Sequence, residues 1–338
     1  MKISESPSLG ELNTFGVEAK ANLRIDIESE EDVLALPLHD PSRDLILGGG
    51  SNVLLVSDIP GTVYLNRIPG HHIIREHEKH VVVEVGGGED WHDFVGWTVD
   101  QGFCGVENLA LIPGCVGSAP IQNIGAYGVE LESVVDSVTT WDLHKQRWQV
   151  FSAEECLFTY RDSLFKSKYP DRYLITSLGL RLNREFCPQV SYPALEQEIR
   201  QSAIGPVNQR AVFDAVIRIR QRKLPSPAMI GNAGSFFKNP LISQTQSVPL
   251  KDQYPEIPVW PGENMQVKLS AAWMIEHCGF KGFRTGAVGV SDQHALVLVN
   301  HGGGTGKELL ELAQTIRETV RTEFDITLEP EPRIVNFN

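Results

Sequence analysis

Leu111–Ile112–Pro113–Gly114–Cys115–Val116–Gly117–Ser118–Ala119–Pro120–Ile121–Gln122–Asn123–Ile124–Gly125–Ala126–Tyr127–Gly128 is the most informative stretch of this 338-residue sequence. Its 18 residues include four glycines, two prolines and no charged side chain. A connection this long without charge is uncommon inside a compact domain. It suits a loop that lies against a large, flat, partly apolar ligand and offers backbone N–H groups to a pyrophosphate. A buried irregular connection is the simpler alternative.

Shorter glycine clusters elsewhere resemble nucleotide-binding loops but lack residues that such loops need. Gly48–Gly49–Gly50–Ser51–Asn52 follows an apolar run, yet Val53 stands where a dinucleotide fingerprint has its third glycine. In the cluster at 301–308, His301 and Glu308 replace the first glycine and the Ser or Thr of a phosphate loop. A Rossmann domain and a P-loop are therefore not expected. Consecutive glycines still let successive N–H groups bind one anion, so the 48–52 loop stays a candidate phosphate site.

Composition places the chain among globular proteins. Apolar residues make up 41% and charged residues 22%, and the net charge of −13 disfavours binding to nucleic acid. No apolar run approaches the roughly 20 residues of a membrane-spanning helix, and the N-terminus has no signal core. The five cysteines form no CxxC pair, so neither a zinc ribbon nor a dithiol site is expected. We expect a cytoplasmic protein without metal, nucleic-acid or membrane partners.

Periodicity predicts alternating β-rich and helical regions. Short apolar runs bounded by turn residues predict strands at 45–47, 53–56, 62–65, 81–85, 134–138 and 173–182. Apolar stripes at helical spacing predict helices from Asp90, over 207–224, over 269–278 and over 307–324. Pro225–Ser226–Pro227 should end the second of these helices and mark a domain boundary.

Six motifs occur in an order that resembles the UDP-N-acetylenolpyruvoylglucosamine reductase family of flavoenzymes. Any one of them is a weak signal, but together they run from Asn13 to Arg333: Asn13–Gly16, Gly48–Asn52, Leu111–Gly128, Tyr160–Ser163, Gly231–Pro240 and Leu328–Arg333.

The resemblance implies an α+β fold of three domains. Two domains would form an FAD-binding unit of the vanillyl-alcohol-oxidase type, over residues 1–69 plus 325–338 and over 70–224. A C-terminal α+β substrate domain would cover 225–324. Val190–Ser191–Tyr192–Pro193 resembles the loop-bearing type I form of the family, in which a tyrosine loop covers the substrate. We expect a monomer.

The family's activity implies two half-reactions. NADPH reduces a non-covalently bound FAD, and the enolpyruvyl group of UDP-N-acetylglucosamine enolpyruvate is then reduced to give UDP-N-acetylmuramate for peptidoglycan synthesis. The resemblance assigns the flavin to Gly48, Gly49, Gly50, Ser51, Asn52, Ile112, Pro113, Gly114, Cys115, Gly117, Ser118, Asn123, Gly125, Ala126 and Tyr127.

Three residues carry the chemistry that this activity needs. Hydride addition leaves an enolate-like charge beside a carboxylate, and the other carbon needs a proton. The resemblance assigns the carboxylate to Arg161, whose fork of donors suits it. Glu331 would act as a neutral acid, and Ser235, helped by a neighbour or a water, would deliver the proton. Without the family, Arg161 could form an ordinary surface ion pair, and Glu331 could be a solvated charge.

The resemblance assigns the sugar nucleotide to five further residues, Tyr160, Tyr192, Lys223, Asn239 and His294. Lys223 could equally be a cation that complements the dipole at the end of its helix. His294 stands where some relatives carry glutamine. Two other functions remain open at this point: a flavin-dependent oxidase of the same fold acting on an alcohol or sugar, and a sugar-nucleotide-binding protein that has lost its flavin.

Overall fold

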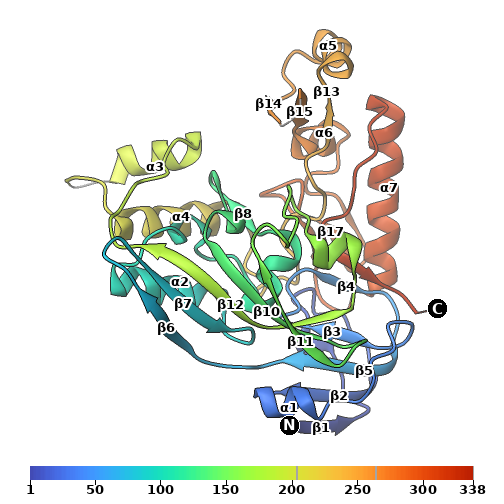
Figure 1. Cartoon of the computed structure of the whole chain (residues 1–338). Helices are drawn as coiled ribbons and strands as arrows, with labels where there is room; N and C mark the ends of the chain where they lie inside the picture. The colour runs from blue at the N-terminus through green and yellow to red at the C-terminus, as the bar shows by residue number, and fades with distance from the viewer. Residues whose placement is uncertain (203–204, 263–264, 338) are drawn as a thin grey trace.

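The computed structural model describes residues 1–202, 205–262 and 265–337. Residues 203–204, 263–264 and 338, which fall within the three expected domains, lie outside the described residues. The chain forms three lobes around their own sheets, and the third stands above the other two in Figure 1.

The first lobe contains a four-stranded sheet of order β1-β2-β5-β3. Strands β2, β5 and β3 run parallel, and β1 is antiparallel to β2. A separate two-stranded parallel ladder joins β4 to β19 from the C-terminal end of the chain. The bounds are β1 (Lys2–Glu5), η1 (Gly10–Leu12), β2 (Ala21–Ile27), α1 (Glu30–Leu34), β3 (Leu45–Leu47), β4 (Val53–Leu55), β5 (Ile59–Asn66) and β19 (Arg333–Val335).

The second lobe is built on a five-stranded antiparallel sheet of order β11-β10-β12-β7-β6. Helix α2 begins after its N-cap Asp90, and its buried stripe of Trp91, Phe94, Val95 and Val99 packs into the same core as this sheet. The strands are β6 (His71–Glu76), β7 (His80–Gly86), β8 (Gly125–Ala126), β9 (Val129–Glu130), β10 (Val135–Asp142), β11 (Arg147–Ser152) and β12 (Tyr173–Asn183). The helices are α2 (Trp91–Gln101), η2 (Glu107–Leu109), η3 (Val116–Gln122), η4 (Leu131–Ser133), η5 (Leu164–Lys168), α3 (Pro193–Ser202) and α4 (Gln209–Lys223).

The third lobe combines two three-stranded antiparallel sheets with three helices. Its core continues into the first lobe through Phe15 and Leu54. The long helix α7 begins with a capping box in which Thr305 and Glu308 exchange hydrogen bonds, so Glu308 serves the helix end rather than a phosphate. The bounds are β13 (Leu241–Ser243), α5 (Gln244–Gln253), β14 (Val259–Pro261), β15 (Gln266–Leu269), α6 (Ala271–His277), β16 (Arg284–Thr285), β17 (Val288–Val290), β18 (Leu298–Asn300) and α7 (Gly306–Phe324).

Apolar packing fixes how the first two lobes meet. Ile25 and Tyr64 of the first sheet lie in one buried cluster with Trp141 and Leu174 of the second. The carboxyl ends of β3 and β5 are thereby held beside the second lobe. Among the helices described, none has the length and apolar character to cross a bilayer.

Candidate functional site

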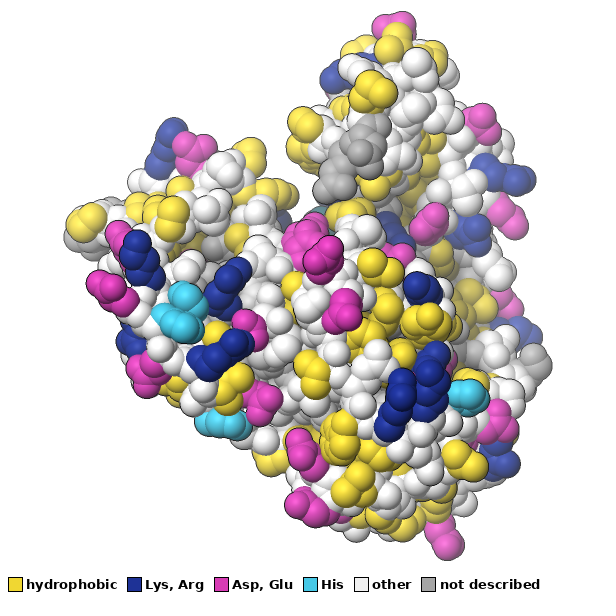
Figure 2. All heavy atoms as spheres, in the orientation of Figure 1, with side chains coloured by type: hydrophobic (Ala, Val, Ile, Leu, Met, Phe, Trp, Pro, Cys, Tyr) yellow, Lys and Arg dark blue, Asp and Glu magenta, His cyan; other side chains and the backbone are white. Residues whose placement is uncertain are grey.

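A cavity of about 460 Å³ lies where the three lobes meet. Figure 2 shows the surface hollowed between the lobe that carries α3 and the lobe that carries α5. Fourteen of the residues predicted from the sequence line the cavity: Gly48, Gly49, Gly50, Ser51, Asn52, Ile112, Pro113, Cys115, Gly117, Ser118, Gly125, Arg161, Ser235 and Glu331. The candidate flavin loops and the candidate catalytic residues therefore share one cavity.

The two candidate flavin loops touch each other backbone to backbone. A Cβ atom added at Gly49 would lie 2.7 Å from the Cα of Gly114. The hydroxyl of Ser51 donates to the carbonyl of Pro113 at 2.8 Å, and the amide of Asn52 donates to the side chain of Gln122. Bare backbone at this contact lets both loops present N–H groups to one ligand.

The 111–128 stretch is more regular than its sequence predicts. Val116–Gln122 forms a 3₁₀-helix whose C-cap, Asn123, adopts a left-handed conformation at φ 44°. The fully buried side chain of Asn123 donates to Glu130 at 2.9 Å and accepts the Glu132 amide N–H at 3.0 Å. Its polar atoms are thus engaged by protein, and it does not line the cavity. Asn123 shapes the loop rather than facing the ligand.

Arg161 and Glu331 form an ion pair in the cavity wall, with 3.2 Å between Nε and Oε1. Arg161 lies in a tight turn in which Asp162 donates to the carbonyl of Thr159, and its φ of 57° is left-handed. Such backbone costs on the order of 1–3 kcal/mol and persists only where its surroundings hold it. A hydrogen bond from Nη2 to the carbonyl of Gly125, 2.8 Å long, holds this guanidinium toward the 111–128 stretch.

Backbone pairing brings Ser235 and Glu331 together. Ser235 pairs with Val297 in a β-bridge, and the Glu331 N–H donates to the carbonyl of Phe236 at 2.8 Å. Gly234, at φ 68°, makes the turn that a residue with a Cβ would resist. Residues distant in sequence therefore converge through backbone pairing.

Two cavity cations were not singled out from the sequence. Arg220 donates from Nε to the carbonyl of Leu111 at 3.1 Å and lies at the hydroxyl of Tyr127, while burial lowers its pKa. Lys166 lies beside the carbonyl of Glu331, and burial together with the nearby Lys238 lowers its pKa. Buried cations in a cavity favour an anionic ligand.

The five residues predicted to bind the sugar nucleotide do not line the cavity. The ring of Tyr192 meets Tyr127 edge-on at 5.4 Å between centroids. Burial raises the pKa of Tyr160, whose hydroxyl is near the backbone amide of Asn239. Lys223 is exposed in the last turn of α4, next to the cavity residue Leu224.

His294 and Asn239 have partners of their own in the protein. The Nδ1 atom of His294 accepts the Leu296 N–H at 3.3 Å, which favours the neutral ring. Burial, with Lys223 and Lys281 nearby, lowers the pKa of His294. The side-chain oxygen of Asn239 accepts the Ala271 N–H at 3.0 Å, at the start of α6. Lys223 and His294 therefore lie close to each other, while the side-chain oxygen of Asn239 caps the start of α6.

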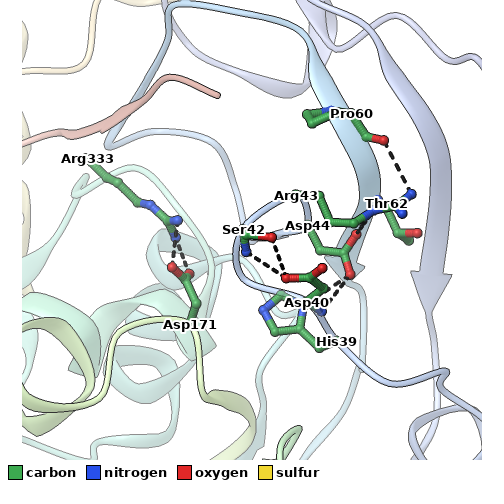
Figure 3. A network of polar contacts seen from close by, with 9 residues as sticks. All are labelled: His39, Asp40, Ser42, Arg43, Asp44, Pro60, Thr62, Asp171 and Arg333. Atoms are coloured by element: carbon green, nitrogen blue, oxygen red, sulfur yellow. Dashed lines mark hydrogen bonds and ion pairs between the residues drawn. The ribbon is translucent and has the colours of Figure 1, made fainter. Parts of the chain in front are cut away.

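Polar contacts hold the segment that leads into β3, and Asp171 and Arg333, which line the cavity, pair nearby (Figure 3). Asp44 accepts the N–H groups of Asp40 at 2.9 Å and Thr62 at 2.8 Å, which ties the segment before β3 to β5. Arg333 forms a two-pronged ion pair with Asp171. This network fixes where β3 delivers the 48–52 loop.

The remaining predicted residues lie behind the cavity wall. Gly114 packs under Gly49 and Ser51, and Ala126 and Tyr127 lie on the far side of Gly125. Cys115, which does line the cavity, is a buried free thiol. Within the described ranges, no three His, Cys, Asp or Glu side chains are grouped closely enough to hold a metal ion.

Comparison with known proteins agrees with this geometry. A family model described as "FAD binding domain" matches residues 32–146, and one described as "UDP-N-acetylenolpyruvoylglucosamine reductase, C-terminal domain" matches residues 225–335. A crystal structure of UDP-N-acetylenolpyruvylglucosamine reductase from Thermus caldophilus has a TM-score of 0.68 at 23% identity and covers 99% of this chain and 98% of its own. This likeness supports the expected α+β fold with separate flavin-binding and C-terminal parts.

Curated relatives extend the match to sequence. The UDP-N-acetylenolpyruvoylglucosamine reductase of Burkholderia multivorans is 46% identical over 327 residues, covering 95% of this chain and 93% of its own length. The enzyme of the same name from Burkholderia ambifaria is 45% identical over 326 residues with the same coverage. With relatives this similar along nearly its whole length, the chain belongs to the UDP-N-acetylenolpyruvoylglucosamine reductase family.

Proposed function

We propose that this protein is an NADPH-dependent flavoprotein oxidoreductase that reduces UDP-N-acetylglucosamine enolpyruvate to UDP-N-acetylmuramate. The observation that carries the proposal is the meeting of Arg161, Ser235 and Glu331 in the wall of a cavity that the two glycine loops also line. Family membership supplies the reaction, and this cavity supplies a place for it.

The residues present fit a non-covalent FAD. Gly49 and Gly114 meet without side chains, so the two loops can cradle a diphosphate with backbone N–H groups. The adjoining wall is partly apolar, with Leu45, Ile112 and Leu174, as a flat aromatic ring requires. When bound, FAD supplies the two-electron carrier between NADPH and the enolpyruvyl group.

Arg161 would hold the carboxylate of the enolpyruvyl group. Its guanidinium already pairs with Glu331, so the substrate carboxylate enters as a competitor for the same donors. In its protonated form, Glu331 would donate a hydrogen bond to the charge that develops beside this carboxylate. Ser235 would give its proton to carbon and take one back from solvent. The backbone pairing of Phe236 with Glu331 keeps the last two residues in register for these roles.

The sugar nucleotide would occupy the hollow outside this cavity. Lys223 is an exposed cation suited to a diphosphate, and the neutral His294 nearby would offer a hydrogen bond. Tyr192 would close over the ligand from the α3 side as in the loop-bearing form. Tyr160 of the second lobe and the Asn239 backbone of the third would lie on its other side.

The proposal also includes the domain division, the oligomeric state and the cellular role. We propose a division into residues 1–69 plus 325–338, 70–224 and 225–324, with a flavin unit of the vanillyl-alcohol-oxidase type; the separate sheets of the three lobes support it. A monomeric, cytoplasmic enzyme of cell-wall biogenesis, acting in cell shape and division, is consistent with a substrate that is a nucleotide-linked precursor.

Absorbance of the purified protein tests the function. We expect a yellow protein whose flavin is released on denaturation, whose colour is bleached by NADPH without oxygen, and whose colour returns at once with UDP-N-acetylglucosamine enolpyruvate. Colourless protein unable to bind FAD would overturn the proposal. Rapid return of colour with oxygen but not with the enolpyruvyl substrate would indicate an oxidase instead.

A further inference from the structure

Tyr192 lies at the end of a segment that has no strand or helix of its own. Residues 184–192 lead from β12 into α3, and the carbonyl of Tyr192 accepts the N–H groups of Leu195 and Glu196 at 2.9 Å each. The side chain is 43% exposed and touches the protein through the edge-on contact with Tyr127. Its position over the site therefore depends on what anchors this segment.

One buried amide joins this segment to the flavin stretch. Asn108, on η2, is 1% exposed, and its Nδ2 donates to the carbonyl of Tyr127 at 3.0 Å and to the carbonyl of Gln189 at 2.7 Å. A primary amide has two N–H donors, so both are used. The two tyrosines that meet at 5.4 Å are thus tied through the backbone by a single side chain.

A second anchor holds the other end of the segment. Glu198, 5% exposed on α3, accepts from Arg218 at 2.8 Å and from Arg222 at 2.6 Å, both on α4. The segment that carries Tyr192 is therefore fixed on its N-terminal side by Asn108 and on its C-terminal side by the pairing of α3 with α4. Of the two anchors, Asn108 is the one that links the segment to the 111–128 stretch.

We propose that Asn108 is a positioning residue for the sugar nucleotide, acting through Tyr192; this rests on the proposed function. By fixing the separation of Tyr127 and residue 189 before ligand arrives, it removes the ordering cost that a loose segment would add to binding. It touches neither the cavity nor the exposed hollow, so it has no part in the chemistry or in flavin reduction.

A double-mutant cycle with Tyr192 separates positioning from general stability. Asn108→Ala in the flavin-loaded enzyme should raise the KM for UDP-N-acetylglucosamine enolpyruvate about tenfold, as expected for lost hydrogen bonds at a buried amide. The kcat and the rate of bleaching by NADPH should stay within twofold. In a Tyr192→Ala background the same substitution should change KM by less than twofold, because its effect passes through that side chain.

Matched variants guard against misfolding. Asn300 is also buried and also donates its amide to two carbonyls, of Phe15 and Gly304. Asn300→Ala should therefore cost comparable stability and leave KM unchanged. Asn108→Ser keeps one donor if Asn108→Ala fails to fold, and should give an intermediate KM. An equal rise of KM in the Tyr192→Ala background, or loss of FAD, would overturn the inference. If wild-type enzyme fails to turn over the enolpyruvyl substrate, the proposed function fails instead.

Discussion

Gly49→Ala should weaken FAD binding solely because the added methyl group has no room. The new methyl would lie 2.7 Å from the Cα of Gly114 and 3.2 Å from the amide nitrogen of Cys115. Ordinary carbon contacts begin near 3.4 Å, so the 48–52 loop and the 111–128 stretch must part by several tenths of an ångström. Gly49 needs no left-handed conformation, and the penalty is therefore one of overpacking.

The size of the effect follows from that overlap. Overpacking of this kind costs about 1–3 kcal/mol. Without flavin, the loops face an open cavity and can relax apart, but a ligand that binds both loops needs them in register. Most of the cost should therefore appear in binding, as a dissociation constant for FAD raised about 5- to 150-fold.

Titration of the flavin-free protein with FAD, followed by quenching of flavin fluorescence, measures this directly. Gly96→Ala is the matched control: its methyl would meet only the Cζ of Phe213 at 3.9 Å, and alanine favours helix α2 by about 1 kcal/mol. It should bind FAD like wild type. If Gly49→Ala binds FAD within twofold of wild type, or merely lowers the melting temperature of the flavin-free protein, the loops do not jointly hold the cofactor.

Other outcomes test the catalytic and structural assignments. Ser235→Ala should leave bleaching by NADPH near normal and slow reoxidation by the enolpyruvyl substrate by about 10²-fold or more in rapid mixing, whereas equal slowing of both would mean that Ser235 only shapes the site. Tyr192→Phe and Lys223→Ala should each raise KM more than they lower kcat in steady-state assays; the opposite split would make them catalytic. Hydrogen bonds from Arg218 and Arg222 hold the pKa of Glu198 below its ordinary value near 4.3. The contribution of ionised Glu198 to folding stability is therefore present above that value and is lost as pH falls through the lower pKa of the folded protein. Urea unfolding should show a gap between wild type and Glu198→Gln that is constant above about pH 5 and shrinks toward pH 3; a gap that does not depend on pH would contradict this.

Local signals were enough for some of the regular elements of the fold. The strand expected at 45–47 is β3, that at 173–182 is β12 with one more residue, and the helix over 307–324 is α7 from Gly306. In each of these elements the apolar residues follow the period of the strand or helix, and turn or cap residues mark its ends. The local sequence and the tertiary contacts therefore favour the same structure. The helix expected from Val207 begins at Gln209, because Asn208 caps it.

Elements that depend on distant partners were missed. Helix α3 was not expected, because its buried face includes Glu198, whose charge is acceptable only beside two arginines of α4. Arg220 was not predicted as a site residue, although it lies four residues after the buried Val216. An arginine at an apolar-face position was the signal for a cavity cation.

The candidate site could be assembled only through the resemblance. Nothing in the spacing of Arg161, Ser235 and Glu331 brings them together; backbone pairing between Phe236 and Glu331 and a left-handed turn at Arg161 do so. Asn123 shows the converse limit. A residue placed within a flavin motif has its side chain engaged by Glu130 and Glu132, and a motif alone does not distinguish a ligand contact from loop support.

The ladder between β4 and β19 also governs the order in which the molecule can be built on a ribosome. Val53–Leu55 is synthesised early, yet its partner Arg333–Val335 is made nearly 280 residues later. Until then the nascent chain lacks both that pairing and Glu331, and the cavity has one wall missing. Such a long-range pairing is slow to form because the intervening chain must close first. Capture of the flavin should therefore be a late event, after the second and third lobes have folded.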